Sequence, residues 1–301
     1  MKTFFLFRAS LAIVLMSLLI TSCSKKESDT QSSPQETAAL ASIESDVEAD
    51  IISNDVFENV MGVNSQVAVG GSGVFAGIAP RSSTGVSGVM GIDTVGKCYT
   101  VTVTNLNQGS IFPVQVVIDF GDGCVGRDGR TRKGKMITVY TKRLVMFDAV
   151  ATTTFDGYSI NGIGIEGSHV ITNTSSINGV SYSIDVDGKL TDASGDFADF
   201  QSEKVIRQTE GNGTPLNLSD DVYAVNGAAS GVTKKGANVY NWSTNITSPL
   251  VKKIGCRWLI KGIIEVSANG TKLAEFDYGS GDCDNEAALK VGNRVRIITL
   301  Y

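Results

Sequence analysis

The chain has 301 residues, a formal net charge of −5 and a single histidine. This acidic balance lacks the basic footprint that nucleic-acid binding requires, so no nucleic-acid partner is expected. The 33 glycines, together with abundant Asn, Thr, Ser and Val, are typical of an exported all-β protein with many tight turns.

Residues 1–22 have the three parts of a signal peptide. Lys2 and Arg8 precede an apolar run of 12 residues, which is shorter than the roughly 20 residues needed to span a bilayer. The sequence Ile20-Thr21-Ser22-Cys23 comes next and resembles the lipobox of bacterial lipoproteins, where a peptidase cuts before a diacylated cysteine. We therefore expect lipidation of Cys23 and attachment to a membrane through that lipid.

Residues 23–37 are polar and charged, with one proline. Such a segment cannot bury enough apolar surface to offset the entropy of ordering, so it is predicted to be a flexible tether. Its stretch Lys25 to Asp29 partly resembles the lysine-plus-acid signal that sends lipoproteins of Bacteroidota to the cell surface, although Ser28 interrupts the acids. The expected location is the cell envelope at the outer membrane, with the surface and the periplasmic face both left open.

Residues 38–61 show a helical pattern in which apolar side chains recur every three or four positions and acids lie between them. The apolar positions are Leu40, Ile43, Val47 and Ile51. This pattern predicts an acidic amphipathic helix that lays its apolar stripe on a sheet. Residues 62–96 are dense in glycine and carry no helix signal.

Residues 97–301 alternate apolar and polar side chains with the period of an antiparallel sheet that is buried on one face. Asn161-Gly162, Asn178-Gly179 and Asn226-Gly227 separate the runs as predicted hairpin turns. The fold class is therefore mainly β, with an antiparallel meander of about 12 strands. An open curved sheet, a sandwich and a barrel are all compatible with this pattern.

An internal duplication is indicated by residues 98–141 and 256–301. Within them, residues 98–121 align with 256–279 without a gap at a shift of 158, and the loop that follows is one residue longer in the second copy. Cys98 matches Cys256, Asp119 matches Asp277, and each aspartate precedes an aromatic residue and a glycine. An even number of cysteines beyond Cys23, in an oxidising compartment, indicates disulfides. The duplication implies the pairs Cys98–Cys124 and Cys256–Cys283.

Hairpin geometry supports the second pair independently. A turn centred on Asn269-Gly270 places Cys256 opposite Cys283, at a Cα separation within disulfide range. In the first copy, Cys124 lies a few residues past the position opposite Cys98, so the chain there must curl back.

Three stretches together resemble an uncharacterised family of Bacteroidota lipoproteins: the lipobox, the sequence IDFGDGCVGRDGRTRKGKMITVYT (118–141) and the sequence TTTFDGYSINGIGIEGSHVITN (152–173). The resemblance covers most of the chain after residue 95. It implies a compartment, the envelope, and implies no activity.

Few residues are suited to catalysis or metal binding. A Ser–His–Asp triad would have to use His169, which lies in a predicted strand, and the paired cysteines leave no thiol nucleophile and no Cys/His zinc site. Two aspartate clusters could bind calcium, but Asp-Gly is also common turn chemistry. These clusters are Asp119, Asp122 and Asp128, and Asp277, Asp282 and Asp284. No metal and no cofactor is expected.

Three functions follow from these features. The first is a membrane-anchored envelope lipoprotein with a non-catalytic binding or structural role, which is not an enzyme. The alternative is a carbohydrate-binding surface lipoprotein, in which Trp242 or Trp258 would stack on sugar rings. Both tryptophans lie in alternating strands, where packing in the core is the favoured role. The third is a carboxylate-dependent hydrolase, which needs two acids facing each other across a cleft.

Overall fold

A computed structural model describes residues 34–61, 89–91 and 98–300, except for 111, 127–128, 178, 212, 214–219, 257 and 269. The chain divides into two compact units, residues 1–32 and 33–301, and only the second contains described residues. The predicted signal peptide, most of the predicted tether and almost all of the glycine-rich segment therefore lie outside the described residues.

One helix, α1 (Pro34–Met61), precedes the sheet. It ends where the sequence predicts but begins four residues earlier, inside the predicted tether. Proline suits the first position of a helix, because its fixed φ is helical and its missing N–H has no intrahelical partner there.

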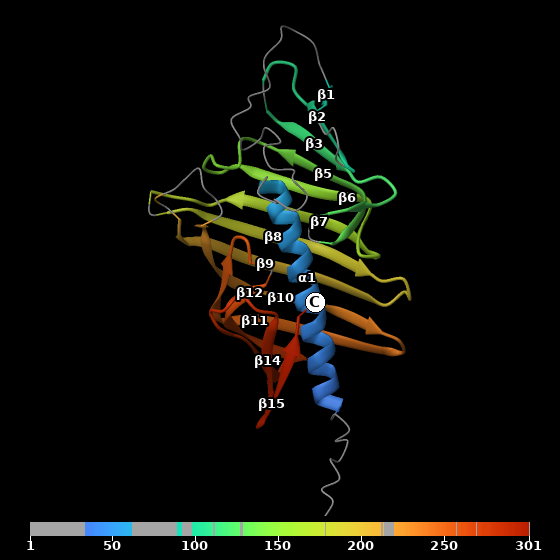
Figure 1. Ribbon diagram of the computed structural model, residues 1–301, viewed down its shortest axis with the longest axis vertical. Helices are drawn as coiled ribbons and strands as arrows, with labels where there is room; N and C mark the ends of the chain where they lie inside the picture. Colours follow the sequence, from blue (N-terminus) through green and yellow to red (C-terminus); the bar gives the residue numbers. More distant parts are fainter. Residues whose placement is uncertain are drawn as a thin grey trace, which may run out of the picture. The chain divides into compact units, whose positions relative to one another are not determined.

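The rest of the described chain forms one open antiparallel sheet, which confirms the mainly β prediction and selects the open curved sheet among the three arrangements. Neighbouring strands pair in chain order from β1 to β15, with β4 pairing only with β5 (Figure 1). The sheet has 15 strands rather than about 12. The strands are β1 (Val89–Gly91), β2 (Thr100–Asn105), β3 (Val114–Asp119), β4 (Cys124–Val125), β5 (Thr131–Tyr140), β6 (Val150–Ile160), β7 (Ile163–Asn173), β8 (Ser181–Thr191), β9 (Phe197–Glu210), β10 (Val222–Lys235), β11 (Asn238–Lys253), β12 (Leu259–Ala268), β13 (Thr271–Ser280), β14 (Glu286–Val291) and β15 (Arg294–Thr299).

The Asn-Gly pairs do not all act as turns. Asn161 and Gly162 connect β6 to β7 with positive φ at both residues, as predicted. The prediction for Asn226-Gly227 is wrong, because both residues lie inside β10, where the pairing with β11 shifts register. Gly227 has φ +142°, and a Cβ atom there would lie 2.1 Å from the Glu203 carbonyl oxygen, so this glycine permits a bulge instead.

Helix α1 crosses one face of the sheet (Figure 1). Contacts reach it from strands far apart in the sheet: Tyr140 of β5 donates a hydrogen bond to the Val60 carbonyl, and the ring of Tyr182 on β8 packs against Phe57. It also packs against β7 and against β10 to β13. The sheet therefore curves around the helix, and the shared core lies between them.

The predicted apolar stripe on α1 is confirmed only in part. Ile43 lies in the core and the half-buried Leu40 and Val47 pack against it, whereas the half-buried Ile51 does not. Other apolar residues of α1 also fill the core: Ala39, Ala49, Ile52, Val56, Phe57, Val60 and Met61. The helix is buried on most of its circumference because the sheet supplies cationic partners for the helix acids.

Candidate functional site

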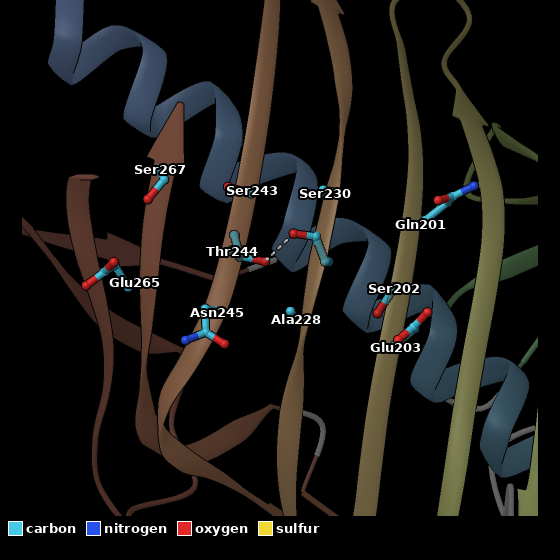
Figure 2. Close-up of a pocket in the computed structure, with 11 residues that line it drawn as sticks. Gln201, Ser202, Glu203, Ala228, Ser230, Ser243, Thr244, Asn245, Glu265 and Ser267 are labelled. Atoms are coloured by element: carbon cyan, nitrogen blue, oxygen red, sulfur yellow. Dashed lines mark hydrogen bonds between the residues drawn. The ribbon is translucent and has the colours of Figure 1, made fainter. Parts of the chain in front are cut away.

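A shallow groove lies on the sheet face opposite α1, over the central strands β9 to β12 (Figure 2). Its volume is about 390 Å³, which is within the range of small-molecule sites. Two neighbouring rows of outward-facing side chains line it. One row is Gln201, Ser230, Ser243 and Ser267, and the other is Glu203, Ala228, Asn245 and Glu265.

The strand register explains why these residues meet. Ser230 pairs with Gln201 of β9 on one side and with Ser243 of β11 on the other. Side chains two positions apart on a strand share a face, so each strand contributes two groove residues. Ala228 and Ser230 of β10 are small and lie at the centre, with the longer Gln201 and Glu203 of β9 on one side and Glu265 of β12 on the other. The lining therefore offers hydroxyl, amide and carboxylate groups and no aromatic ring.

The two groove carboxylates belong to different surroundings. Glu265 is paired with Lys272, whose Nζ atom lies 2.8 Å from a Glu265 oxygen and 2.8 Å from a Glu275 oxygen. These hydrogen bonds raise the pKa of Lys272. Glu203 faces Asp185 of β8 across the strand pair on the exposed surface. On one side of the groove the charge of Glu265 is therefore neutralised by Lys272, and on the other side Glu203 and Asp185 form an acidic surface.

Buried polar contacts connect the groove floor to α1. The Thr244 hydroxyl donates to Asp46 at 3.1 Å on the helix side of the sheet. Burial raises the pKa of Asp46 to about 6, although the nearby Lys204 ammonium acts in the opposite direction. Lys204 itself forms an ion pair with Asp50. The helix therefore fixes the strands under the groove through side-chain pairs and not through apolar packing alone.

Asp55 is the most heavily bonded acid of the helix. It forms a salt bridge with Arg132, which also donates from Nε to the second carboxylate oxygen at 3.2 Å, and Arg130 Nη1 lies 3.2 Å from the first oxygen. Asn59 donates to the same carboxylate. All of these side chains are buried. The sequence does not predict this cluster, because the pattern of α1 shows that acids alternate with apolar residues but not which distant strand supplies their cations.

His169 is buried on the inner face of β7, and its Nε2 lies 3.0 Å from the Ser53 hydroxyl of α1. Burial lowers the pKa of His169 to about 4. The adjacent cavity is apolar and holds about 20 Å³, room for roughly one water molecule. This serine–histidine pair has no room for a substrate beside it, so the geometry favours a structural histidine.

The expectation that Trp242 stacks on a sugar is wrong. Trp242 is only 3% exposed, and its indole N–H donates to the Thr233 hydroxyl at 2.9 Å. The alternation of β11 turns this residue toward the helix, where Ser45 continues the hydrogen-bonded chain. Trp258 is half-buried and packs against the core. Neither tryptophan lines the groove.

Both predicted cysteine pairs form disulfides, Cys98–Cys124 and Cys256–Cys283. The second pair lies beyond the ends of β12 and β13, whose register shifts twice along the hairpin. In the first copy Cys124 lies in β4, which leaves the β2–β3 hairpin and pairs with β5, so the chain curls back as expected.

Three aspartates of the two clusters accept turn hydrogen bonds from the backbone. Asp119 and Asp277 each accept from the backbone N–H two residues on, at Gly121 and Gly279, and Asp284 accepts from Glu286. Asp128 lies outside the described residues. Among residues that are described, no group of three or more His, Cys, Asp or Glu side chains is placed to hold a metal ion.

The predicted lipidation site, Cys23, lies outside the described residues. No helix in the described part of the chain is long and apolar enough to cross a membrane. Comparison with known proteins finds no matching family model, no matching curated protein and no matching solved structure.

Proposed function

We propose that this chain is a lipid-anchored cell-envelope protein with a non-catalytic binding role, and that the groove over β9 to β12 is its binding site. The observation that carries the proposal is the groove lining, in which eight outward-facing residues of four strands combine. They supply hydroxyl and amide groups but no nucleophile–base pair.

The anchor rests on the amino-terminal sequence. A positively charged start, a short apolar run and Ile20-Thr21-Ser22-Cys23 have the order of a bacterial lipoprotein signal. Several acyl chains on one cysteine would hold the protein firmly, because each buried methylene contributes about 0.8 kcal/mol. The outer membrane is the proposed location, with the resemblance to Bacteroidota lipoproteins as support.

The ligand class that fits the groove is a neutral polyhydroxylated molecule, such as a carbohydrate chain. Serine hydroxyls, the Asn245 amide and the Gln201 amide both donate and accept hydrogen bonds, as sugar hydroxyls do. An anionic ligand is disfavoured by Glu203 and the neighbouring Asp185. Binding would rely on polar contacts on a flat sheet and not on tryptophan stacking.

A blocked groove tests this role. Ser230 is exposed on the groove floor, so Ser230→Tyr should fill the groove without disturbing the core. Affinity electrophoresis in gels containing dextran, mannan or xylan should show retardation of the wild type and loss of that retardation in the variant. Thr154→Tyr, on the same exposed face but on β6, is the matched control and should retain it. Equal retardation of both variants would remove the groove from the proposal.

The anchor has its own experiment. Cells given radiolabelled palmitate should label the wild-type protein, and Cys23→Ala should lose both the label and the membrane-bound fraction. Protease treatment of intact cells, with a periplasmic protein as control, then distinguishes surface display from a periplasmic position. Retention of label by Cys23→Ala would contradict lipidation at this residue.

The hydrolase alternative finds less support. Glu203 and Glu265 are separated by three strand spacings, about 14 Å, which exceeds the separation of roughly 5–9.5 Å that glycosidase acids use. The closer pairs are Asp185 with Glu203 on an open surface, and Glu265 with Glu275 bridged by Lys272.

A further inference from the structure

The two ends of the sheet differ in their exposed apolar side chains. At one end most connections are tight, such as Asn161-Gly162 between β6 and β7 and the Gly292 turn between β14 and β15. The β3–β5 connection at that end is longer and carries the exposed Val125 of β4. The other end carries longer loops. Five of the ten large apolar side chains exposed in the described residues lie there, in the three loops β2–β3, β5–β6 and β7–β8. We call these five the apolar loop cluster: Leu106, Val145, Met146, Phe147 and Ile177.

The exposure in the β5–β6 loop is built into its backbone. Leu144 is fully buried, and its carbonyl accepts a hydrogen bond from the Asn173 side chain at 2.6 Å. The Lys142 ammonium donates to the Phe147 carbonyl and closes the loop. Between these fixed points, Val145, Met146 and Phe147 are 57%, 52% and 56% exposed. Three consecutive apolar side chains are thus held in solvent by a hydrogen-bonded turn.

The neighbouring loop extends the same surface. The Asp148 N–H donates to the Asn173 carbonyl, which connects the β5–β6 loop to the start of the β7–β8 loop. Ile177, in that second loop, is 96% exposed. Apolar side chains exposed together in this way mark a surface that is covered in use.

The charges around the cluster indicate what covers it. In the sequence of the three loops the only charged residues are Lys142, Arg143 and Asp148, which leaves a net positive charge, and the other polar residues are Asn, Gln, Ser and Thr. Apolar side chains at a tip with cations at its base match the interface of a bilayer, where apolar groups enter the acyl region and cations meet anionic headgroups.

We propose that the apolar loop cluster inserts into the interface of a lipid bilayer that contains anionic phospholipid. A protein partner is the less favoured occupant, because the five side chains are divided among three separate loops. The inference does not depend on lipid at Cys23 or on a ligand in the groove. It can therefore fail while the proposed function stands.

The experiment uses residues 33–301, which form a compact unit whose core is made entirely within it and which lacks Cys23. Co-sedimentation with phosphatidylcholine vesicles containing phosphatidylglycerol should recover the wild-type unit. The variant Val145→Ser/Met146→Ser/Phe147→Ser should partition at least about tenfold more weakly, because three apolar side chains no longer enter the bilayer. The matched control Val239→Ser/Val295→Ser/Ile297→Ser alters three equally exposed apolar residues elsewhere and should bind like the wild type.

Two further measurements separate insertion from nonspecific binding. Tryptophan emission of Phe147→Trp should shift to shorter wavelength when vesicles are added, and that of Val239→Trp should not. Arg143→Gln should weaken binding to the anionic vesicles by roughly fivefold and leave binding to pure phosphatidylcholine unchanged. Circular dichroism and thermal midpoints matching those of the wild type confirm that each variant is folded.

Two results overturn the proposal. If the serine triple variant binds vesicles as tightly as the wild type, the cluster is not the inserting surface. If the wild-type unit binds neither vesicle type, a lipid surface is not the occupant and the cluster serves a protein partner.

Discussion

The two disulfide-closed segments lie near opposite edges of the sheet, yet both position a basic side chain against the last turns of α1. In the first segment, Cys124 of β4 lies opposite Arg132 of β5, and Arg132 forms a salt bridge with Asp55 of the helix. In the second, the Cys256 carbonyl accepts a hydrogen bond from Lys252, whose ammonium lies 3.5 Å from Glu58. A disulfide near each edge of the sheet therefore helps to hold the carboxy-terminal end of α1 in place.

The two ion pairs differ in their surroundings. The side chains of Asp55 and Arg132 are almost fully buried and share several hydrogen bonds, whereas Glu58 remains partly exposed. Burial raises the pKa of Glu58 and lowers the pKa of Lys252, so loss of hydration outweighs their attraction. The two ion pairs therefore contribute unequally to stability, because a buried charge depends on how completely it is hydrogen-bonded.

The largest expected effect comes from removing the better-bonded acid. Asp55→Ala leaves Arg130 and Arg132 buried without their carboxylate and should lower the free energy of unfolding by about 3–5 kcal/mol. Glu58→Ala, the matched change at the other edge, should cost about 1 kcal/mol or less. Urea denaturation followed by circular dichroism measures both values. Equal losses would contradict the comparison.

The disulfides come next. The sequence separations of 26 and 27 residues are nearly equal, so chain entropy alone assigns each bridge about 3.5 kcal/mol. The double variants Cys98→Ala/Cys124→Ala and Cys256→Ala/Cys283→Ala are compared by the same denaturation. We expect the first double variant to lose more unfolding free energy, because its bridge also holds Arg132 against Asp55. A larger loss in the second double variant would contradict this expectation.

Two buried groups on α1 and the strands it contacts should respond oppositely to pH. The pKa of His169 is lowered to about 4 from 6.5, so the unfolded chain binds its proton first and stability is lost as pH falls from 6.5 toward 4. The pKa of Asp46 is raised to about 6 from 3.8, so stability is lost as pH rises through 6. Each effect is about 3 kcal/mol when complete.

Variants separate these opposing contributions. Relative to the wild type, His169→Gln should lose stability as the pH rises from 4 to 6, because the Asp46 contribution is no longer offset. Asp46→Asn should gain stability over the same range. Unfolding free energies measured at several pH values test both slopes, and parallel curves for all three proteins would refute the assignment.

The smallest expected effect compares the two aspartates that the duplication matches. Asp119 and Asp277 make the same hydrogen bond to the backbone two residues on. Asp119→Ala and Asp277→Ala should therefore each cost about 1 kcal/mol, and Asp277→Ala slightly more, because its carboxylate also lies 3.5 Å from the Lys290 ammonium. Thermal midpoints are sensitive enough to detect this. A loss in only one variant would show that the two turns are not equivalent.

The duplication itself is only partly reflected in the fold. Its two hairpins and their disulfides correspond, as the aligned cysteines and aspartates predict. Gly134 and Gly292 also align at the shift of 158, but their positions in the fold differ. Gly134 lies inside β5, where a Cβ atom would be 2.2 Å from the Gly157 carbonyl oxygen, and Gly292 lies in the turn between β14 and β15. The alignment of the two copies detects their shared turn residues but not β4, the strand that only the first copy contains.

The candidate site was largely hidden from sequence reasoning. Trp242 is the sugar-stacking candidate that the sequence offers, but it lies on the helix side of β11. The groove residues are serines, amides and carboxylates of ordinary types, and they form a site only because the register places them in two rows. One signal was available, the alternation of β11, which puts Ser243 and Asn245 on the face opposite Trp242.

The sequence by itself determined the features that depend on neighbouring residues. These are the alternating strands, the Asn161-Gly162 turn and the cysteine pairs, because period-two patterning, turn chemistry and hairpin spacing act over short distances. The tertiary structure alone decided that the acids of α1 are buried, that Asn226-Gly227 is a bulge and that the groove exists. Each of these features depends on a cation, a carbonyl or a facing side chain from a strand that is distant in the sequence. The local sequence therefore cannot predict them.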